Sequence, residues 1–136
     1  MDSKLFDSTS KLLSKYLDLA SMRHDTIANN VACVDVPGYK AVDLKFEEEL
    51  SKVVGQNSLS LTSTNINHMP SSKNLIDQIK PRLVYENNST MRNDLNDVNI
   101  DQEMAKLAEN SIQYNTAVQL ISFKLKMLGD AIRGGK

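Results

Sequence analysis

Two histidines and one cysteine are the side chains of this chain best suited to bind a metal or to act as a nucleophile. His24 and His68 are far apart in the sequence and lack the spacing typical of metal ligands. His24 falls on the apolar stripe of an expected helix, where a packed, hydrogen-bonded histidine is the common role. Cys33 has no Lys, Arg or His beside it that would favour a reactive thiolate, so we expect a small buried side chain. These residues predict no metal site and no catalytic centre.

Three consecutive carboxylates, Glu47, Glu48 and Glu49, could in principle hold Ca²⁺ or act as an acid and base pair. Neighbouring residues of a helix point in different directions, so this run is better explained as a solvated helix face. The sequence also lacks a phosphate-binding loop, a dinucleotide fingerprint and a nucleophile elbow. It therefore predicts a protein that is not an enzyme and that needs no cofactor.

Composition narrows the function classes further. The 136 residues carry 17 acidic and 16 basic side chains, so there is no basic excess of the kind that binds nucleic acid. A single Cys excludes an internal disulfide. The long apolar segments are amphipathic and predict no membrane span. The N-terminus has neither an apolar signal core nor a small-residue cleavage site, so we expect any export to proceed without a cleaved signal peptide.

The last third of the chain organises the rest. Its apolar residues recur at alternating spacings of three and four, which is the pattern of a coiled-coil helix. The pattern predicts a helix over 101–132, about 48 Å long, capped by Asn99 or Asp101. A helix of this length needs a partner for its apolar stripe. This C-terminal seam comprises Met104, Leu107, Ser111, Tyr114, Val118, Ile121, Leu125, Leu128 and Ile132.

A second seam predicts a helix over 8–33, starting near Asp7 or Ser8 and ending before Pro37. The two helices supply each other's apolar stripe, so we expect an antiparallel coiled-coil hairpin. This N-terminal seam comprises Phe6, Ser10, Leu13, Leu17, Ala20, His24, Ile27, Val31 and Val34. Other apolar residues would stay exposed on a lone hairpin and would mark a protein interface. They are Leu12, Tyr16, Leu19, Ala108, Ala117, Leu120, Met127 and Ala131.

The insert over 34–100 has a different character. Residues 36–39 predict a tight turn in which Gly38 adopts a positive φ. Residues 44–54 predict a short helix stopped by Gly55. Residues 56–99 are rich in Asn, Ser, Thr and Asp, and only 82–86 suggest a strand, so we expect a loose segment ordered mainly by contact with something else. The fold class is mainly α: one unit over 1–136, with two long terminal helices and an irregular, partly extended insert.

The stretch Ala28–Lys40, ANNVACVDVPGYK, resembles the ANNxAN…TPGYK motif of the bacterial flagellar rod, hook and related axial proteins. Residues 98–104, followed by the long heptad helix, are similar to the C-terminal signature of that family. Cys33 and Val36 stand where the family usually has Asn and Thr. If those side chains bridge the turn, this chain must satisfy its backbone another way. The family motif turn maps onto Asn29, Asn30, Pro37, Gly38 and Tyr39.

The resemblance implies a structural subunit of the proximal rod of the flagellar basal body, exported unfolded through the type III apparatus and located in the periplasm. It implies that the terminal helices pack subunits into a helical tube that transmits torque. The implied partners are further copies, other rod proteins, a small rod adaptor protein, and the membrane ring and export gate at the base. Asn29 and Asn30 would bond the backbone or a neighbouring subunit where the helix ends. The alternative is a soluble helical adaptor or chaperone that binds a partner helix.

Overall fold

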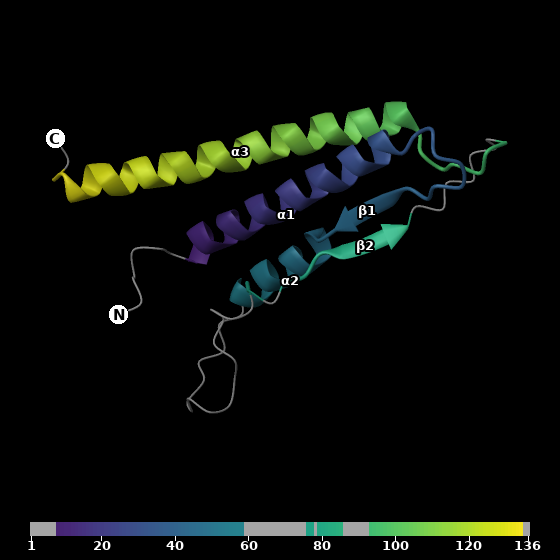
Figure 1. Cartoon of the computed structure of the whole chain (residues 1–136). Helices are drawn as coiled ribbons and strands as arrows, with labels where there is room; N and C mark the ends of the chain where they lie inside the picture. Colours follow the sequence, from purple (N-terminus) through teal and green to yellow (C-terminus); the bar gives the residue numbers. More distant parts are fainter. Residues whose placement is uncertain (1–7, 59–75, 78, 86–92, 135–136) are drawn as a thin grey trace.

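The computed structural model describes residues 8–58, 76–77, 79–85 and 93–134, with the side chains of 56–58 excepted. Figure 1 shows three layers, in which α3 lies along α1 and α1 lies along a two-stranded ribbon that leads into a short helix. The terminal helices run antiparallel, as predicted, and the fold is mainly α with a small strand-containing insert. The elements in chain order are α1 (Ser8–Ala32), β1 (Val42–Lys45), α2 (Glu47–Ser58), β2 (Arg82–Tyr85) and α3 (Ile100–Ile132).

The long C-terminal helix begins at a capping asparagine. Asn99 has an extended backbone, and its side-chain oxygen accepts the backbone N–H groups of Asp101 and Gln102, at 3.0 and 3.4 Å. Such a cap satisfies two of the N–H groups that the first turn of a helix leaves unpaired. The acidic residues Asp101 and Glu103 in that turn favour the positive end of the helix dipole. The predicted bounds of 101–132 therefore agree with α3 within one residue.

The first helix also matches its predicted range of 8–33 within one residue, because α1 ends at Ala32. The seam residue Phe6 and the alternative helix start Asp7 lie outside the described residues. The chain leaves α1 through tight turns in which the N–H of Val36 donates to the carbonyl of Cys33. Gly38 follows with a φ of +73°, as the turn pattern predicted. No helix of the described residues is long and apolar enough to cross a membrane.

The insert departs from the sequence prediction at residues 44–58. A helix beginning at Leu44 is wrong, because residues 42–45 form β1 and pair antiparallel with β2, with Leu44 opposite Leu83. The helix α2 begins at Glu47, where three consecutive glutamates occupy its positive end. Gly55 does not stop α2, which continues to Ser58. Gly55 lacks the positive φ of a helix-terminating glycine.

A small core lies between α1 and the insert. Phe46 is its largest member, and its ring meets that of Tyr16 edge-on at 5.7 Å between centroids. The expectation that Leu19 and Tyr16 stay exposed is wrong, because the insert covers this face of α1. Ile76 and Ile79, which fall in the stretch expected to be loose, are also buried in this core. The core residues are Leu19, Leu44, Phe46, Val53, Ile76 and Ile79, and Leu12, Tyr16 and Leu50 pack against them.

Candidate functional site: the helix pair and its turn

The contact between α1 and α3 includes polar side chains of both helices. Three side-chain hydrogen bonds cross it, which we call the polar rungs: Tyr16 to Gln113 (3.1 Å), Asn110 to the carbonyl of Ala20 (3.0 Å), and Asn30 to Glu103 (2.8 Å). From one rung to the next the residue number rises on α1 and falls on α3. All three rungs therefore share one antiparallel register. The buried residues of α3 are Glu103, Asn110 and Ala117, which are spaced seven residues apart.

The C-terminal seam is not the face that α3 buries against α1. Met104 and Leu125 are 51% and 50% exposed, and Tyr114 and Ile132 are exposed as well. The remaining members are only half-buried: Leu107, Ser111, Val118, Ile121 and Leu128. Full burial of this seam against α1 was therefore a wrong expectation at Met104 and Tyr114, and so was the exposure of Ala117. Leu125 and Ile132 lie past the start of α1 in the register that the rungs set, because α3 is the longer helix (Figure 1). The role of the seam towards other subunits stays a prediction.

The N-terminal seam faces the interior more closely. Ser10, Ala20 and Ile27 are buried, whereas His24 is exposed, so the packed histidine expected there is wrong. His68 lies outside the described residues. The half-buried members are Leu13, Leu17, Val31 and Val34.

Asn30 joins four parts of the molecule. Its amide nitrogen donates to the carbonyl of Val42 and to Glu103, both at 2.8 Å. Its oxygen accepts the Tyr39 hydroxyl and the N–H of Val42, both at 3.1 Å. The side chain is buried and uses both donors and both acceptor sites of an amide. Burial, with Cys33 close by, raises the pKa of Tyr39. Asn30 therefore ties α1 to the turn, to β1 and to α3.

The other motif residues lie on the outside of the turn. Asn29, Pro37 and Gly38 are exposed and Tyr39 is half-buried. The N–H of Gly38 donates to the carbonyl of Asp94 at 2.8 Å. Of the two adjacent asparagines, Asn30 makes the internal bonds while Asn29 stays at the surface.

Asn96 is a functional residue that the sequence prediction missed. Its amide nitrogen lies 3.0, 2.9 and 2.8 Å from the carbonyl oxygens of Cys33, Val34 and Val36, and its oxygen accepts the N–H of Val98 at 2.7 Å. The side chain is fully buried. Asn96 thus satisfies the backbone of the turn in this chain, in which Cys33 and Val36 replace the usual family residues. Nothing in an Asn-rich stretch distinguished it from its neighbours.

The buried carboxylates of this junction are paired with lysines. Glu103 is 2% exposed and accepts both Asn30 and, at 2.8 Å, the ammonium of Lys106. Asp97 is also buried and lies 2.6 Å from the ammonium of Lys40. A buried carboxylate is tolerated when it is paired and hydrogen-bonded in this way. These groups therefore hold the turn against the start of α3.

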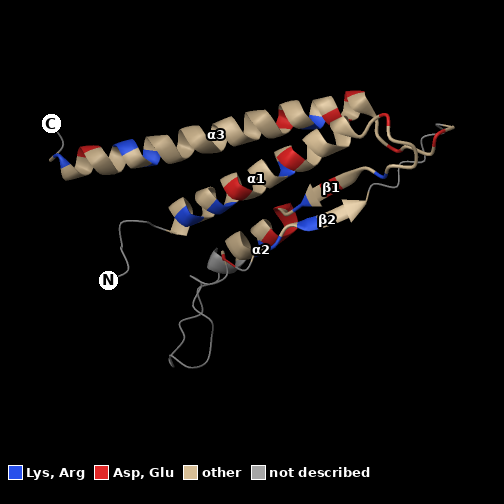
Figure 2. Cartoon of the chain, in the orientation of Figure 1, with Lys and Arg blue, Asp and Glu red and all other residues tan. Residues whose placement is uncertain are grey.

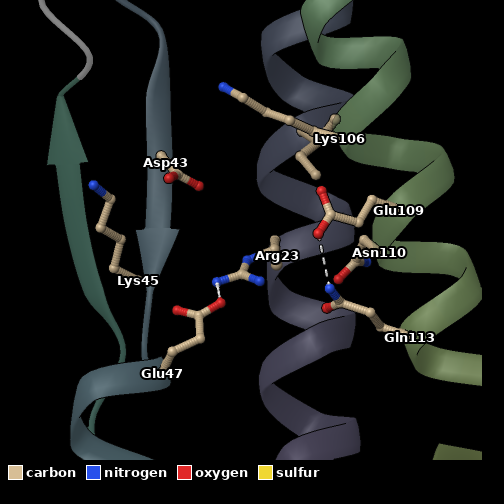
Figure 3. A pocket seen from close by; sticks show the side chains of 9 residues that line it. Arg23, Asp43, Lys45, Glu47, Lys106, Glu109, Asn110 and Gln113 are labelled. Atoms are coloured by element: carbon tan, nitrogen blue, oxygen red, sulfur yellow. Dashed lines mark hydrogen bonds and ion pairs between the residues drawn. The ribbon is translucent and has the colours of Figure 1, made fainter. Parts of the chain in front are cut away.

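A polar groove of 250 Å³ runs beside the helix pair, and Figure 3 shows its charged side chains. Arg23 donates to the carbonyl of Leu44, at 3.0 and 2.7 Å, and is ion-paired with Glu47. Burial works to raise the pKa of Glu47, but hydrogen bonds from Arg23 and from backbone N–H groups outweigh it and hold that pKa below its usual range. Glu109 accepts the amide of Gln113 at 3.0 Å. Within the described residues, no three His, Cys, Asp or Glu side chains are placed to hold a metal ion.

Comparisons with known proteins agree with the motif. No protein-family model matches the chain. The chain is 35% identical to the flagellar basal body rod protein FlgB of Borreliella burgdorferi, over 88% of this chain and 93% of that protein. It is 28% identical to FlgB of Salmonella typhimurium, over 95% and 96% of the two chains. It is 29% identical to FlgB of Bacillus subtilis, over 97% and 98%. The chain therefore belongs to the FlgB family of flagellar basal body rod proteins.

Proposed function

We propose that this rod protein is a structural subunit of the proximal rod, and that it packs against neighbouring subunits through the outward face of α3. The observation that carries this proposal is the apolar surface of that helix. Ile112 and Phe123 are 68% and 64% exposed, and no charged residue occurs between Glu109 and Lys124. Figure 2 shows this uncharged stretch of α3 in tan. The exposed large hydrophobic residues of α3 are Ile100, Met104, Ile112, Tyr114, Leu120, Phe123, Leu125, Met127 and Ile132.

An apolar face of this size usually marks a protein interface. The middle helix, α1, is covered by α3 on one side and by the insert on the other, whereas α3 is covered on one side only (Figure 1). An apolar groove of 350 Å³ at the edge of the helix pair adds to this face. Its lining includes Leu12 and Leu13 of α1 and Ile112 and Leu120 of α3. We infer that a neighbouring subunit places apolar side chains here.

Two different surfaces of a subunit that meet head to tail generate a helical array when their rotation does not close. We therefore propose that the seams join subunits laterally and axially into a tube that transmits torque. The seam residues in this role are Phe6, Leu13, Leu17, Ile27, Val31, Met104, Leu107, Tyr114, Val118, Ile121, Leu125, Leu128 and Ile132.

We also propose the partners and the location of this subunit. The partners are further copies, other rod proteins, a small rod adaptor protein, and the membrane ring and export gate at the base. The location is the periplasmic part of the basal body. We propose a mechanical and not an enzymatic role, because Asn30, Asn96 and Glu103 all serve hydrogen bonds that hold the fold together. Nothing in the comparisons favours a soluble adaptor.

The test replaces an exposed seam residue by a charge. Leu125→Asp should leave the fold of the isolated chain nearly unchanged, because Leu125 is already half exposed there. The same change should abolish incorporation into the rod and swimming in soft agar, because a charge would then be buried between subunits. Gln102→Asp is the matched control, since it places the same charge at an exposed polar position of the same helix, outside the uncharged stretch. Normal swimming of Leu125→Asp would contradict the proposal.

A further inference from the structure

We propose that the polar rungs determine which face of α3 turns towards α1, and that Asn110 is the residue that specifies this rotation. The rungs thereby keep the apolar seam of α3 from turning fully onto α1, so that neighbouring subunits can reach its exposed members. The use of the seam by neighbours rests on the proposed function. The effect of the rungs on the rotation of α3 does not.

A modest rotation of α3 about its own axis would give a competing arrangement of the two helices. Met104, Ser111 and Val118 each follow a buried residue of α3 by one position. One residue corresponds to about 100° around an α-helix. A rotation of α3 by less than a third of a turn would therefore bring the apolar seam onto α1. Burial of apolar surface favours that rotation, so something else must hold the observed arrangement.

The Asn30–Glu103 rung opposes the rotation at one end of the pair. Glu103 is 2% exposed, and its carboxylate accepts Asn30 at 2.8 Å. A rotated α3 would move Glu103 away from Asn30, which would leave a buried amide N–H without this acceptor. The Tyr16–Gln113 rung, at 3.1 Å, opposes the same motion farther along the helices.

The middle rung, formed by Asn110, lowers the stability of the folded chain, and this cost indicates its role. Asn110 is 3% exposed, and its nitrogen donates to the carbonyl of Ala20 at 3.0 Å. Its side-chain oxygen has less than 1 Å² of accessible surface and no hydrogen-bond partner among the described residues. A buried acceptor without a donor is unfavourable, and an apolar side chain of similar size would avoid that cost.

A buried asparagine of this kind has a known physical use in helix pairs. In coiled coils a single polar core residue lowers stability but selects one register over its competitors. Asn110 meets a backbone carbonyl that lies at only one place on α1, so its bond is lost whenever α3 rotates or slides. We therefore assign Asn110 to specificity of packing, not to stability.

The experiment measures which residues of α3 face α1 in the isolated full-length chain. On a Cys33→Ala background, Met104→Cys reports on the seam and Ala117→Cys reports on the buried face. With the rungs intact, the cysteine at 104 should react with a maleimide at least ~10-fold faster than the cysteine at 117, because only the first is exposed. Adding Glu103→Ala and Asn110→Ala removes two rungs without adding apolar surface to the buried face. It should lower that ratio by at least ~5-fold, because the seam would turn inward.

The matched control is Gln102→Ala with Gln119→Ala, which makes the same kind of truncation at two exposed positions of α3. An unchanged ratio in the Glu103 and Asn110 variant, with its helical circular dichroism retained, would overturn the proposal. If that variant loses its helical signal, Asn110→Ala alone decides, because it removes only the middle rung. It should still lower the ratio. A parental ratio in that variant would equally overturn the proposal. Neither readout depends on rod assembly, so the result stands apart from the Leu125→Asp test.

Discussion

Gly38 offers the sharpest test of the turn that joins α1 to the insert. Its φ of +73° lies in the left-handed region, where an L-residue with a Cβ is strained. A Cβ built at Gly38 meets nothing within 4 Å, and the same holds at Gly55 in α2. Valine at either position therefore creates no steric clash, and the two substitutions differ mainly in the backbone conformation that they require.

The expected loss of unfolding free energy for Gly38→Val follows from two ways in which the backbone could respond. Holding valine at this φ costs at least about 1–2 kcal/mol. Relaxing to a negative φ would move the N–H that donates to Asp94 at 2.8 Å, and a lost hydrogen bond costs about 1 kcal/mol or more. We expect Gly38→Val to lower the free energy of unfolding by about 2 kcal/mol. Gly55→Val should be nearly neutral or slightly stabilising, because valine is a somewhat better helix former than glycine.

The assay is thermal unfolding of the purified chain, followed by helical circular dichroism. Gly38→Val should reduce the melting temperature by roughly 4–8 °C, and Gly55→Val should change it by about 2 °C or less. Gly38→Asn should fall between the parent and the valine variant, since asparagine tolerates the left-handed conformation better. Equal losses at the two glycines, or a larger loss at Gly55, would refute the reasoning.

Two further predictions concern the polar junction. Asn96→Ala should lower the free energy of unfolding by about 2–4 kcal/mol, because it removes the amide that serves three turn carbonyls; Asn93→Ala, at an exposed position, is the control in a denaturant titration. The pKa of Glu47 is lowered in the folded chain from 4.5, so the stabilisation it provides is present above about pH 4.5 and is lost as the pH falls through the folded value. Melting temperatures measured from pH 7 down to pH 3 should therefore fall less steeply for Glu47→Gln than for the parent, and parallel curves would contradict this assignment.

The contact between the terminal helices differs from that of a typical helix pair, because buried polar side chains lie in it. In a typical helix pair the apolar stripes face each other, and stability and specificity come from the same residues. Here Asn30, Asn110 and Glu103 occupy the contact, and much of the apolar surface of α3 remains available to other chains. Such a subunit gains additional stability when it binds its neighbours.

The sequence by itself determined the features that depend on local signals. Heptad periodicity, the Asn99 cap and the stop before Pro37 predicted both long helices to within one residue. The turn chemistry of Gly38 and the strand near 82–86 were also predictable, because backbone preferences act over a few residues. The two terminal signatures were sufficient to predict the family.

Only the tertiary structure decided which surfaces meet. Periodicity locates an apolar stripe but does not identify what covers it, so the rotation of α3 and the covering of Leu19 by the insert could not be predicted. Residues 42–45 became a strand because a partner strand distant in the sequence pairs with them. Asn96 acquired its role because folding places its amide beside three carbonyls of a turn about 60 residues earlier. Each of these outcomes depends on contacts between distant segments, and the spacing of residues along the chain carries no record of such contacts.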